Sequence, residues 1–584
     1  MKTFKQNLIL ILIILVVLSG CVGGQEKARK PSEDFSRGLQ LVEDASSSIG
    51  YAVAEDGSSV EIVSTFQKDD GRTGLRYLRI NSKTEIVVNK ELNYDFGIYA
   101  RTPWIFSDGD VIQLIWASRS NTQEGWQLWY ARLNKEGDLT ADPIWVSDGS
   151  AGIRDYGLIS DQQNGAWVYW EERKPERIMI TRISGSGQIS DSPRVLIEKG
   201  SDPSIRIGES GEYWIAWRDD SVLYFDRLDI HQDLPLAGEE LIDLKVNLGN
   251  TLEGPVLGLS DQYAYVFWSV LRQTGMLAGT AVTEYVAFPV NSPEQLRRQN
   301  VSIYPDDKER YQPYQGEFKL SSLIPPPPEN YLSTDYVFSP QTSSGPGPVV
   351  LSVAATQLNR LDSYIQVAVG IFEDGKLIGY TLATDTTQIS QDAVIEVDSN
   401  GFFHILWREG AAGEEIFYAS TSPEVKDSLD KVVISDLPTL LFSGGLEALT
   451  GILLFPFAFP WMALGFLIMI VWRLIQNDEN ITMPWSIIIT IIALVSFQAS
   501  KLLFLPDILL YVPFSAWLDI PAGVGSVLIY LVPILIFGIG ILSAEIRRRK
   551  QEDPPSSLSY FLVVVLVDTV ITLGIYGVIF LGEY

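Results

Sequence analysis

Cys21 is the first residue in this sequence whose type and position predict chemistry. It is the only cysteine among 584 residues, and it follows the apolar run 8–18 and two small residues. Lys2 and Lys5 precede that run. A positive start, an apolar stretch of this length and small residues before the cut are typical of a secretory signal. We therefore predict a signal peptide over 1–21 with a lipid on Cys21, and an uncleaved membrane anchor is the alternative.

Asp568 is the second such residue, because it is the one acidic residue well inside a C-terminal apolar segment. An ionisable group in a bilayer is costly and by default marks a functional or helix-pairing position that faces the bundle interior. Thr569, Thr572 and Gln498 are the hydrogen-bonding partners that we expect for it. Lys501 is expected to be a poor partner, because it lies nearer the outer surface. Transport or proton chemistry and a hydrogen-bonded packing contact both stay open.

Histidines and acidic turns predict no metal centre. His231 and His404 are the only histidines, which excludes a multi-histidine zinc or iron site within one chain. His404 lies within an apolar strand pattern, where we expect a structural histidine. The Asp-rich turns at 68–71 and 107–110 lack the alternating spacing of a calcium loop, so calcium stays open but unsupported. We predict no cofactor, identify no catalytic residue, and expect a non-enzyme rather than an enzyme.

Composition narrows the class of partner. The net charge is -28, and nucleic-acid binding needs basic patches that release counterions, so we exclude a nucleic-acid partner. With the only cysteine assigned to a lipid, the exported part has no disulfide. Buried apolar area and sheet hydrogen bonds must therefore hold it together.

A repeated unit runs from about residue 50 to residue 435. In each copy a turn, in most copies with a glycine, leads into an apolar strand that ends on tryptophan. Successive tryptophans at 116, 170, 217 and 268 are 54, 47 and 51 residues apart, which is the period of a four-stranded propeller blade. A second marker, an arginine followed by an aliphatic residue, keeps this rhythm at Arg79, Arg132, Arg182 and Arg227. We expect these arginines to share a packing or hydrogen-bonding role in each blade, rather than to form one active site.

The repeats predict an all-β propeller over 50–435 with about seven four-stranded blades, and six or eight are also compatible. Residues 22–49 are predicted to be a linker. The irregular, Pro-rich insertion 288–348 is predicted to be a loop excursion from the ring, since proline removes ladder donors and favours extended segments. This loop is either a partner contact or a disordered spacer. Blade centres are expected near Ile62, Trp116, Trp170, Trp217, Trp268, Val353 and Trp407.

The last repeat, from Asp398 to Pro423, resembles the blades of the sialidase-like, or BNR-type, propeller superfamily. The resemblance lies in the order of Asp398, the turn residue Gly401, a strand with His404 and Trp407, an acidic turn and a Tyr-Ala strand. It implies a propeller fold. The sequence departs from that family because the Ser-x-Asp-x-Gly-x-x-Trp pattern is absent, and no local motif places an arginine triad or a tyrosine nucleophile. Glycosidase activity is therefore not carried over.

The C-terminal part of the chain, 446–582, predicts a helical membrane bundle of four spans. The segments at about 450–472, 484–504, 522–544 and 560–581 are apolar and long enough to cross a hydrocarbon core. Basic residues 547–550 lie between the third and fourth spans, so 545–558 is predicted to be cytoplasmic. Three predicted spans separate this cytoplasmic segment from the propeller, so the propeller is predicted to be extracytoplasmic. The predicted signal peptide and lipid at Cys21 imply the same side. The expected location is the cell membrane, with a lipid anchor and several spans.

These features favour a surface binding or scaffolding protein for a protein or glycan partner, because a propeller supplies a platform and no chemistry is visible. Four spans and a lipid exceed what tethering requires, so we expect contacts with membrane lipid and with a membrane or cell-surface protein. One alternative is a sensor or transport-complex component that works through the bundle and Asp568. The other alternative is a sialidase-like glycoside hydrolase.

Overall fold

The computed structural model describes residues 32–576 apart from gaps, of which the longest are 431–450 and 514–521. Cys21 and His231 lie outside the described residues. The chain divides into two compact units. One unit is Gln25–Lys431, and the other comprises Val432–Tyr584 with Met1–Gly24.

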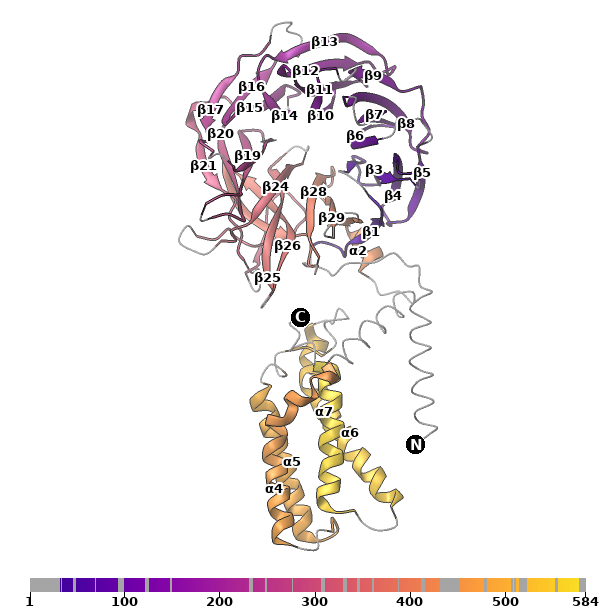
Figure 1. Ribbon diagram of the computed structural model, residues 1–584, viewed down its shortest axis with the longest axis vertical. Helices are drawn as coiled ribbons and strands as arrows, with labels where there is room; N and C mark the ends of the chain where they lie inside the picture. The colour runs from indigo at the N-terminus through magenta and orange to yellow at the C-terminus, as the bar shows by residue number, and fades with distance from the viewer. Residues whose placement is uncertain are drawn as a thin grey trace. The chain divides into compact units, whose positions relative to one another are not determined.

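The described residues of the first unit form seven four-stranded sheets arranged as wedges around an axis (Figure 1). The predicted propeller of seven blades is therefore confirmed. Blades 1 to 3 are β2 (Gly50–Val53), β3 (Ser59–Gln67), β4 (Thr73–Asn81) and β5 (Ile86–Glu91); β6 (Tyr99–Asp108), β7 (Val111–Arg119), β8 (Gln127–Asn134) and β9 (Ile144–Ser147); and β10 (Ile153–Ser160), β11 (Ala166–Arg173), β12 (Glu176–Ile183) and β13 (Ile189–Ile197).

The remaining blades complete the ring. Blades 4 and 5 are β14 (Ser201–Ile207), β15 (Tyr213–Asp219), β16 (Val222–Leu228) and β17 (Glu239–Asp243); and β18 (Thr251–Leu259), β19 (Tyr263–Arg272), β20 (Thr280–Pro289) and β21 (Arg297–Asn300). Blades 6 and 7 are β24 (Val337–Thr342), β25 (Val349–Asn359), β26 (Asp362–Glu373) and β27 (Lys376–Leu382); and β28 (Ser390–Val397), β29 (Phe403–Glu409), β30 (Glu415–Ser420) and β1 (Leu39–Val42).

Each second strand faces two neighbouring blades, which explains why these strands are apolar on both sides. In β7, Ile112, Leu114 and Trp116 belong to the core between blades 1 and 2. The intervening Ile115 and Ala117 belong to the core between blades 2 and 3. Side chains alternate across a strand, so a wedge buried on both faces needs a continuous apolar run. One such buried cluster lies between each pair of neighbouring blades.

The ring is closed by its own N-terminal strand. β1 pairs antiparallel with β30, with Leu39 opposite Tyr418, and so supplies the outermost strand of the last blade. The sequence placed residues 22–49 in a linker, and that prediction was wrong for β1. A four-residue apolar strand carries no repeat marker, and its partner lies almost the whole propeller away in sequence.

The insertion 288–348 is more ordered than an excursion or a spacer in the parts that the structure describes. It contains β21 of blade 5 and β24 of blade 6, and also a small sheet of β22 (Gln312–Pro313) and β23 (Ser322–Leu323). Ile324 pairs with Tyr380 of β27, and Phe318, Leu320 and Leu323 are buried between blades 6 and 7. The described part of this insertion is therefore packed against the ring rather than disordered.

Antiparallel order gives the ring two distinct faces. On one face, the first strand of each blade begins and the second strand ends. We call it the bulge face, because the first strands of six blades bulge there. The turns between first and second strands and between third and fourth strands lie on the opposite face, which we call the turn face. The innermost strands of neighbouring blades contact one another around the axis.

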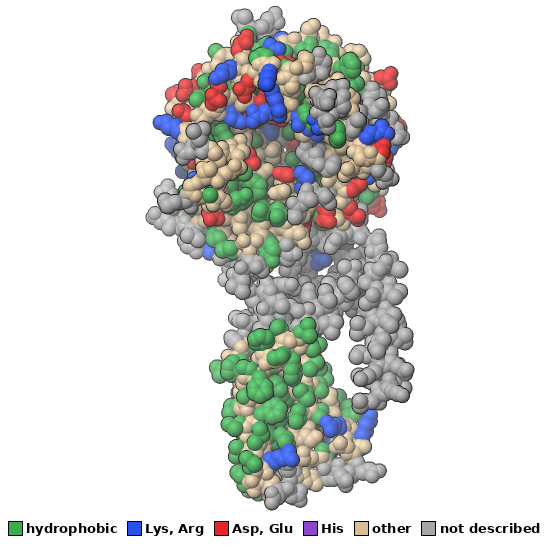
Figure 2. Space-filling model, viewed as in Figure 1, with side chains coloured by type: hydrophobic (Ala, Val, Ile, Leu, Met, Phe, Trp, Pro, Cys, Tyr) green, Lys and Arg blue, Asp and Glu red, His purple; other side chains and the backbone are tan. Residues whose placement is uncertain are grey.

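The described residues of the second unit form four helices long and apolar enough to span a membrane. They are α4 (Phe459–Ile475) with the preceding η3 (Phe455–Ala458), α5 (Pro484–Phe504), α6 (Ala522–Lys550) and α7 (Ser557–Tyr576). Hydrophobic side chains cover much of the visible surface of this unit, and basic side chains are also visible on it (Figure 2). Exposed apolar side chains such as Leu467 and Ile491 are what a lipid environment requires.

Candidate functional site

The innermost strands carry a repeated distortion on the bulge face. In six blades the pairing register between the first and second strands shifts near the start of the first strand, so the first strand bulges. We call the residues at these positions the bulged rim. Five are the first unpaired residue of their bulge, and Asp155 is the second unpaired residue of its bulge, after Arg154: Thr102, Asp155, Asp202, Gly254, Ser339 and Asp392.

Local sequence explains most of these bulges. In four blades the rim residue precedes a proline, which cannot donate a ladder hydrogen bond. The backbone at Thr102, Asp202, Ser339 and Asp392 is left-handed, with φ of 47°, 48°, 56° and 52°, and Gly254 has φ of 93°. Small or short polar residues tolerate that conformation best. A small or polar residue followed by proline at the start of a first strand is thus the sequence signal that our sequence analysis missed.

Ion pairs within blades and hydrogen bonds between neighbouring blades hold the bulged rim. Asp202 of blade 4 pairs with Arg218, and its backbone N–H donates to Glu171 Oε2 of blade 3 at 3.0 Å. Glu171 also accepts from Arg154 at 3.3 Å. On the other side of the ring, Asp392 accepts from Arg408 and from the Ser339 hydroxyl, each at 3.3 Å.

Burial raises the pKa of two carboxyl groups, one on the bulged rim and one beside it. Burial raises the pKa of Asp155 to about 7, and the neighbouring negative charges of Asp202 and Glu171 add to that shift. Burial likewise raises the pKa of Glu253, next to the rim residue Gly254, and Asp392 adds to it. Asp155 is therefore a carboxyl group that holds a proton close to neutral pH beside the ion-paired Asp202.

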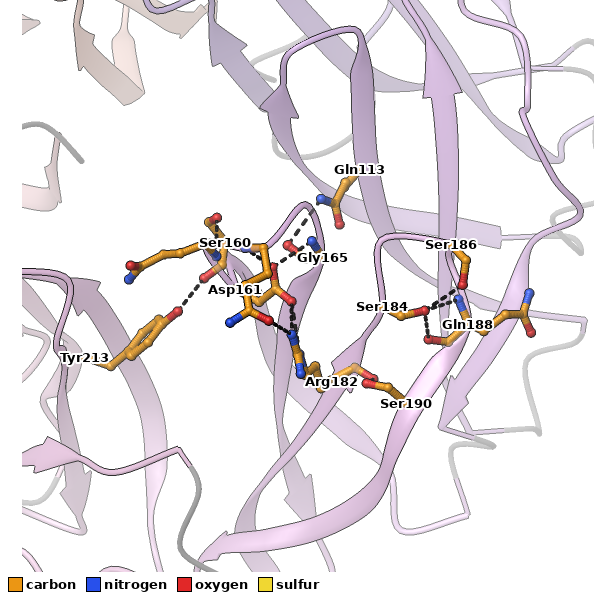
Figure 3. Close-up of polar contacts among 12 residues, drawn as sticks. Gln113, Ser160, Asp161, Gly165, Arg182, Ser184, Ser186, Gln188, Ser190 and Tyr213 are labelled. Atoms are coloured by element: carbon orange, nitrogen blue, oxygen red, sulfur yellow. Dashed lines mark hydrogen bonds and ion pairs between the residues drawn. The ribbon is translucent and has the colours of Figure 1, made fainter.

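The turn face carries a different set of polar contacts, which hold turns in place. Asp161 Oδ1 accepts from the backbone N–H of Gly165 at 2.6 Å, and its Oδ2 accepts from Arg182 at 2.7 Å (Figure 3). Tyr213 of the next blade donates to the Ser160 carbonyl at 3.0 Å (Figure 3). The bonds of Asp161 hold the turn between β10 and β11, and the bond of Tyr213 links blade 4 to blade 3.

The repeated arginines lie near these turns. Arg79 donates to the Lys135 carbonyl at 3.1 Å, and Arg132 donates to the Gly185 carbonyl. Both acceptors lie in the turn between the third and fourth strands of the following blade. This confirms the expected blade-level role for these two arginines, while Arg182 instead pairs within its own blade.

His404 is a structural residue in a buried polar group. Its Nδ1 lies 2.8 Å from the Tyr418 hydroxyl, and its Nε2 lies 3.4 Å from Asp398 Oδ2. The side chain is fully buried. Both ring nitrogens are thus engaged by the protein, as expected of a histidine inside a blade.

In the second unit, Asp568 lies at the centre of a polar cluster between α5 and α7. Gln498 Nε2 donates to Asp568 Oδ2 at 3.0 Å, and Thr572 Oγ1 lies 3.4 Å from Oδ1. Lys501 Nζ lies 2.7 Å from Oδ1, and both charged side chains are almost completely buried. Gln498 and Thr572 were expected.

The expectation that Lys501 is a poor partner was wrong. Lysine has a four-carbon stem, so its ammonium group lies well away from the position of its backbone along the helix. Lys501 also approaches the Thr572 hydroxyl at 3.3 Å. The described residues of the bundle therefore hold a compensated ion pair, and Asp568 is not an isolated charge.

Metal ligands do not gather in the part of the chain that the structure describes. No group of three or more His, Cys, Asp or Glu residues there is arranged to hold a metal ion. The predicted lipidation site, Cys21, falls outside that part.

Comparisons with known proteins find similar structures but no family and no activity for this chain. No protein-family model and no curated protein matches the sequence. Among solved structures, the chain is similar to an ulvan lyase of polysaccharide lyase family PL25, with 8% identity, 67% of this chain and 100% of that chain covered, and a TM-score of 0.37. It is also similar to the Dos1 propeller, with 8% identity, 66% of this chain and 95% of that chain covered, and a TM-score of 0.35. A GH43_1 enzyme from Xanthomonas citri has 10% identity, 39% of this chain and 83% of that chain covered, and a TM-score of 0.27. Identities and scores this low carry no substrate or activity to this chain.

Proposed function

We propose that this chain is a membrane-anchored, extracytoplasmic propeller that binds a partner on its bulge face. The observation that carries the proposal is where the chain enters and leaves the ring. The Arg37 backbone N–H donates to Asp430 Oδ1 at 2.9 Å, so both ends of the propeller meet. The final helix α2 (Pro423–Leu429) contacts the turn face, where the Ser428 hydroxyl donates to the Lys83 carbonyl at 2.7 Å.

The described residues at both ends of the propeller therefore lie at the turn face, opposite the bulge face. The bulge face also carries the rim of polar and ionisable side chains. Bulges commonly occur next to functional sites, where they redirect side chains. A surface that is polar, repeated around a ring and opposite both described ends of the propeller suits the display of a binding site.

The proposed orientation has support within the bundle. The loops between α4 and α5 and between α6 and α7 lie at one end, because Asn480 pairs with Ser556. Arg473 and the basic residues 547–550 lie at the same end of their helices. Basic residues favour the cytoplasmic side, so this end is the proposed cytoplasmic one. A lipid on Cys21 would anchor the other end of the chain.

Site-specific crosslinking tests the binding proposal. Replacing Cys21 with serine allows single cysteines to carry a photo-crosslinker, at Thr274 on the bulge face or at Ser186 on the turn face. Both side chains are exposed. We expect discrete crosslinked products on intact cells from Thr274→Cys and few from Ser186→Cys. Equal products from both positions, or products from Ser186→Cys alone, would contradict the proposal.

A second candidate function, glycoside hydrolysis, is favoured by Asp155 and Asp202 alone. Acid and base roles require two carboxyl groups in different environments, and Asp155 is buried with a raised pKa while Asp202 pairs with Arg218. A hydrolysis screen with varied glycans tests it. Asp155→Asn should abolish any activity found, and activity that survives this change would exclude the assignment.

A sensor or transport role through Asp568 is the remaining alternative. The ion pair with Lys501 supports a helix-pairing role more than proton transfer, since the carboxylate is already neutralised and hydrogen-bonded. Asp568→Asn should leave a binding protein working and disable a proton-coupled one in a reconstituted membrane. Unchanged activity there would remove this alternative.

A further inference from the structure

The arginines of the bulge face fall into two groups. Most have a carboxylate partner: Arg154, Arg177, Arg218 and Arg408 pair with Glu171, Glu172, Asp202 and Asp392. Arg101, Arg119 and Arg173 have no carboxylate within ion-pair distance among the described residues. The chain has 72 acidic and 44 basic residues, yet no carboxylate of the described residues pairs with these three neighbouring arginines.

Arg101 and Arg119 are held in place by aromatic rings. The guanidinium carbons of Arg101 and Arg119 lie 4.1 and 4.5 Å from the centre of the Trp126 ring, and Arg119 lies 5.0 Å from that of Tyr99. Tyr99 lies directly opposite Arg119 in the sheet, so these side chains share one face of blade 2. Stacking on a ring fixes a guanidinium group while leaving its N–H donors available at the edges.

Arg173 approaches from blade 3 and completes the group. The Arg173 backbone N–H donates to the Gly152 carbonyl at 2.8 Å, and Arg101 reaches the adjacent Ile153 carbonyl at 3.2 Å. Burial lowers the pKa of Arg101, and the positive charges of Arg173 and Arg119 lower it further. The positive charges of Arg119 in blade 2 and Arg173 in blade 3 therefore both act on Arg101.

Donors remain unused in this group. The Nε atoms of Arg101 and Arg119 are buried and have no hydrogen-bond acceptor among the described residues. The described residues therefore do not use all the donors of these two guanidinium groups. The negative charge of Asp155 acts on Arg101, but burial raises the pKa of Asp155 to about 7, so this carboxyl carries only part of a charge at neutral pH.

We propose that Arg101, Arg119 and Arg173, with Trp126 and Tyr99, form a binding site for an anionic polysaccharide that carries carboxylate or sulfate groups. Guanidinium groups present paired N–H donors that match the planar oxygens of a carboxylate or two oxygens of a sulfate. Trp126 and Tyr99 hold two of these guanidinium groups side by side, so the site suits a polymer that presents several anionic groups in a row. This inference rests on the proposed use of the bulge face for binding and names the chemistry of its ligand.

Binding to defined polymers tests the inference on the full chain in lipid nanodiscs. The probes are polygalacturonate for carboxylate, dextran sulfate for sulfate, uncharged dextran, and poly-L-glutamate as an acidic peptide. Arg101→Gln with Arg119→Gln removes the two stacked cations, and Arg173→Gln removes the exposed one. Arg76→Gln is the matched control, because Arg76 also stacks on a ring, that of Phe66, but has Asp44 as its partner.

We expect the wild type to bind at least one of the two charged polysaccharides, and salt to weaken that binding. The double variant should bind about tenfold more weakly or worse, Arg173→Gln several-fold more weakly, and Arg76→Gln like the wild type. Preference between the two polymers identifies the anion. Thermal unfolding checks the fold of the double variant, and the exposed Arg173 variant tests the site without disturbing the ring stack.

The inference is overturned if neither charged polysaccharide binds, if all variants bind equally, or if dextran or poly-L-glutamate binds as tightly. Its failure and that of the proposed function are distinguishable. Crosslinking confined to the bulge face without polysaccharide binding would overturn only the ligand class. Crosslinking that does not distinguish the two faces would overturn the proposed function itself.

Discussion

Asp155 shows how a single side chain on the bulged rim acquires unusual chemistry. Desolvation disfavours its charged form, and the negative charge of Asp202 acts in the same direction. The adjacent Arg154 opposes this shift but is itself drawn to Glu171. Asp155 therefore couples the stability of the ring to pH, whether or not it takes part in a reaction.

We predict that Asp155→Asn makes stability less dependent on pH. The pKa of Asp155 is about 7 in the folded protein and about 3.9 in an unfolded chain. Between these values the folded form binds more protons, so the free energy of unfolding falls as pH rises, by at most about 1.4 kcal/mol per pH unit. The variant should lose less stability than the wild type from about pH 4 to pH 7.

Urea unfolding at a series of pH values, followed by tryptophan fluorescence, measures this slope. Asp110→Asn is the control, because that side chain is almost fully exposed. Equal slopes in the wild type and Asp155→Asn would show that Asp155 is ionised in the folded protein at these pH values.

At the scale of elements, the buried ion pair between α5 and α7 affects the stability of the bundle and the orientation of its helices. Lys501 and Asp568 neutralise each other, and Gln498 and Thr572 satisfy further hydrogen bonds. A pair of this kind contributes little net stability but makes each partner depend on the other. It thereby fixes how the two helices face each other.

We predict strong coupling between Lys501→Met and Asp568→Leu. Each single change leaves a buried charge unpaired and should cost about 3–5 kcal/mol. The double variant should lose much less than the sum, because no charge then remains. Thermal unfolding of the full chain in nanodiscs gives the coupling free energy. Additive losses would mean that the two side chains do not form a pair in the membrane.

The closing strand gives a second prediction at this scale. Leu39 is almost fully buried between the last and first blades, so Leu39→Asp should place an unpaired charge at the seam of the ring. We expect a loss of about 3 kcal/mol or more in the free energy of unfolding. Glu43→Gln, at an exposed position just beyond β1, is the control. A Leu39→Asp variant as stable as this control would exclude closure by β1.

The strands that carry a repeated residue in each blade could be predicted from the sequence. Trp116, Trp170, Trp217, Trp268 and Trp407 all lie in second strands and are fully buried, because a wedge between two blades demands large apolar side chains there. Strand β1 was missed, because it is short and pairs with a strand almost 380 residues away. The Lys501 partner was also missed, since position along a helix does not reveal where a long side chain ends.

The bulged rim could be predicted only in part, because its residues come from different blades and are far apart in the sequence. The residue–proline steps at 102–103, 202–203, 254–255 and 339–340 are visible in the sequence, yet their alignment at one level of the ring appears only when the blades are superposed. The arginine group is harder still. Arg101 and Arg173 are 72 residues apart and meet because blades 2 and 3 are neighbours.

At the scale of the whole molecule, function depends on which side of the membrane the propeller occupies. The signal-like start with Cys21, the four spans and the basic end of the bundle all predict an extracytoplasmic ring. Access to an anionic polysaccharide or a cell-surface partner requires that placement. A cytoplasmic ring would leave the bulge face without the ligand class proposed for it.

Labelling with a membrane-impermeant maleimide tests this placement most directly. The two positions are Thr274→Cys on the bulge face and Gln551→Cys after the basic residues of α6, each with Cys21→Ser; both native side chains are exposed. We predict that Thr274→Cys is labelled on intact cells and that Gln551→Cys is labelled only after the membrane is permeabilised. Labelling of Gln551→Cys on intact cells, with Thr274→Cys protected, would contradict the account.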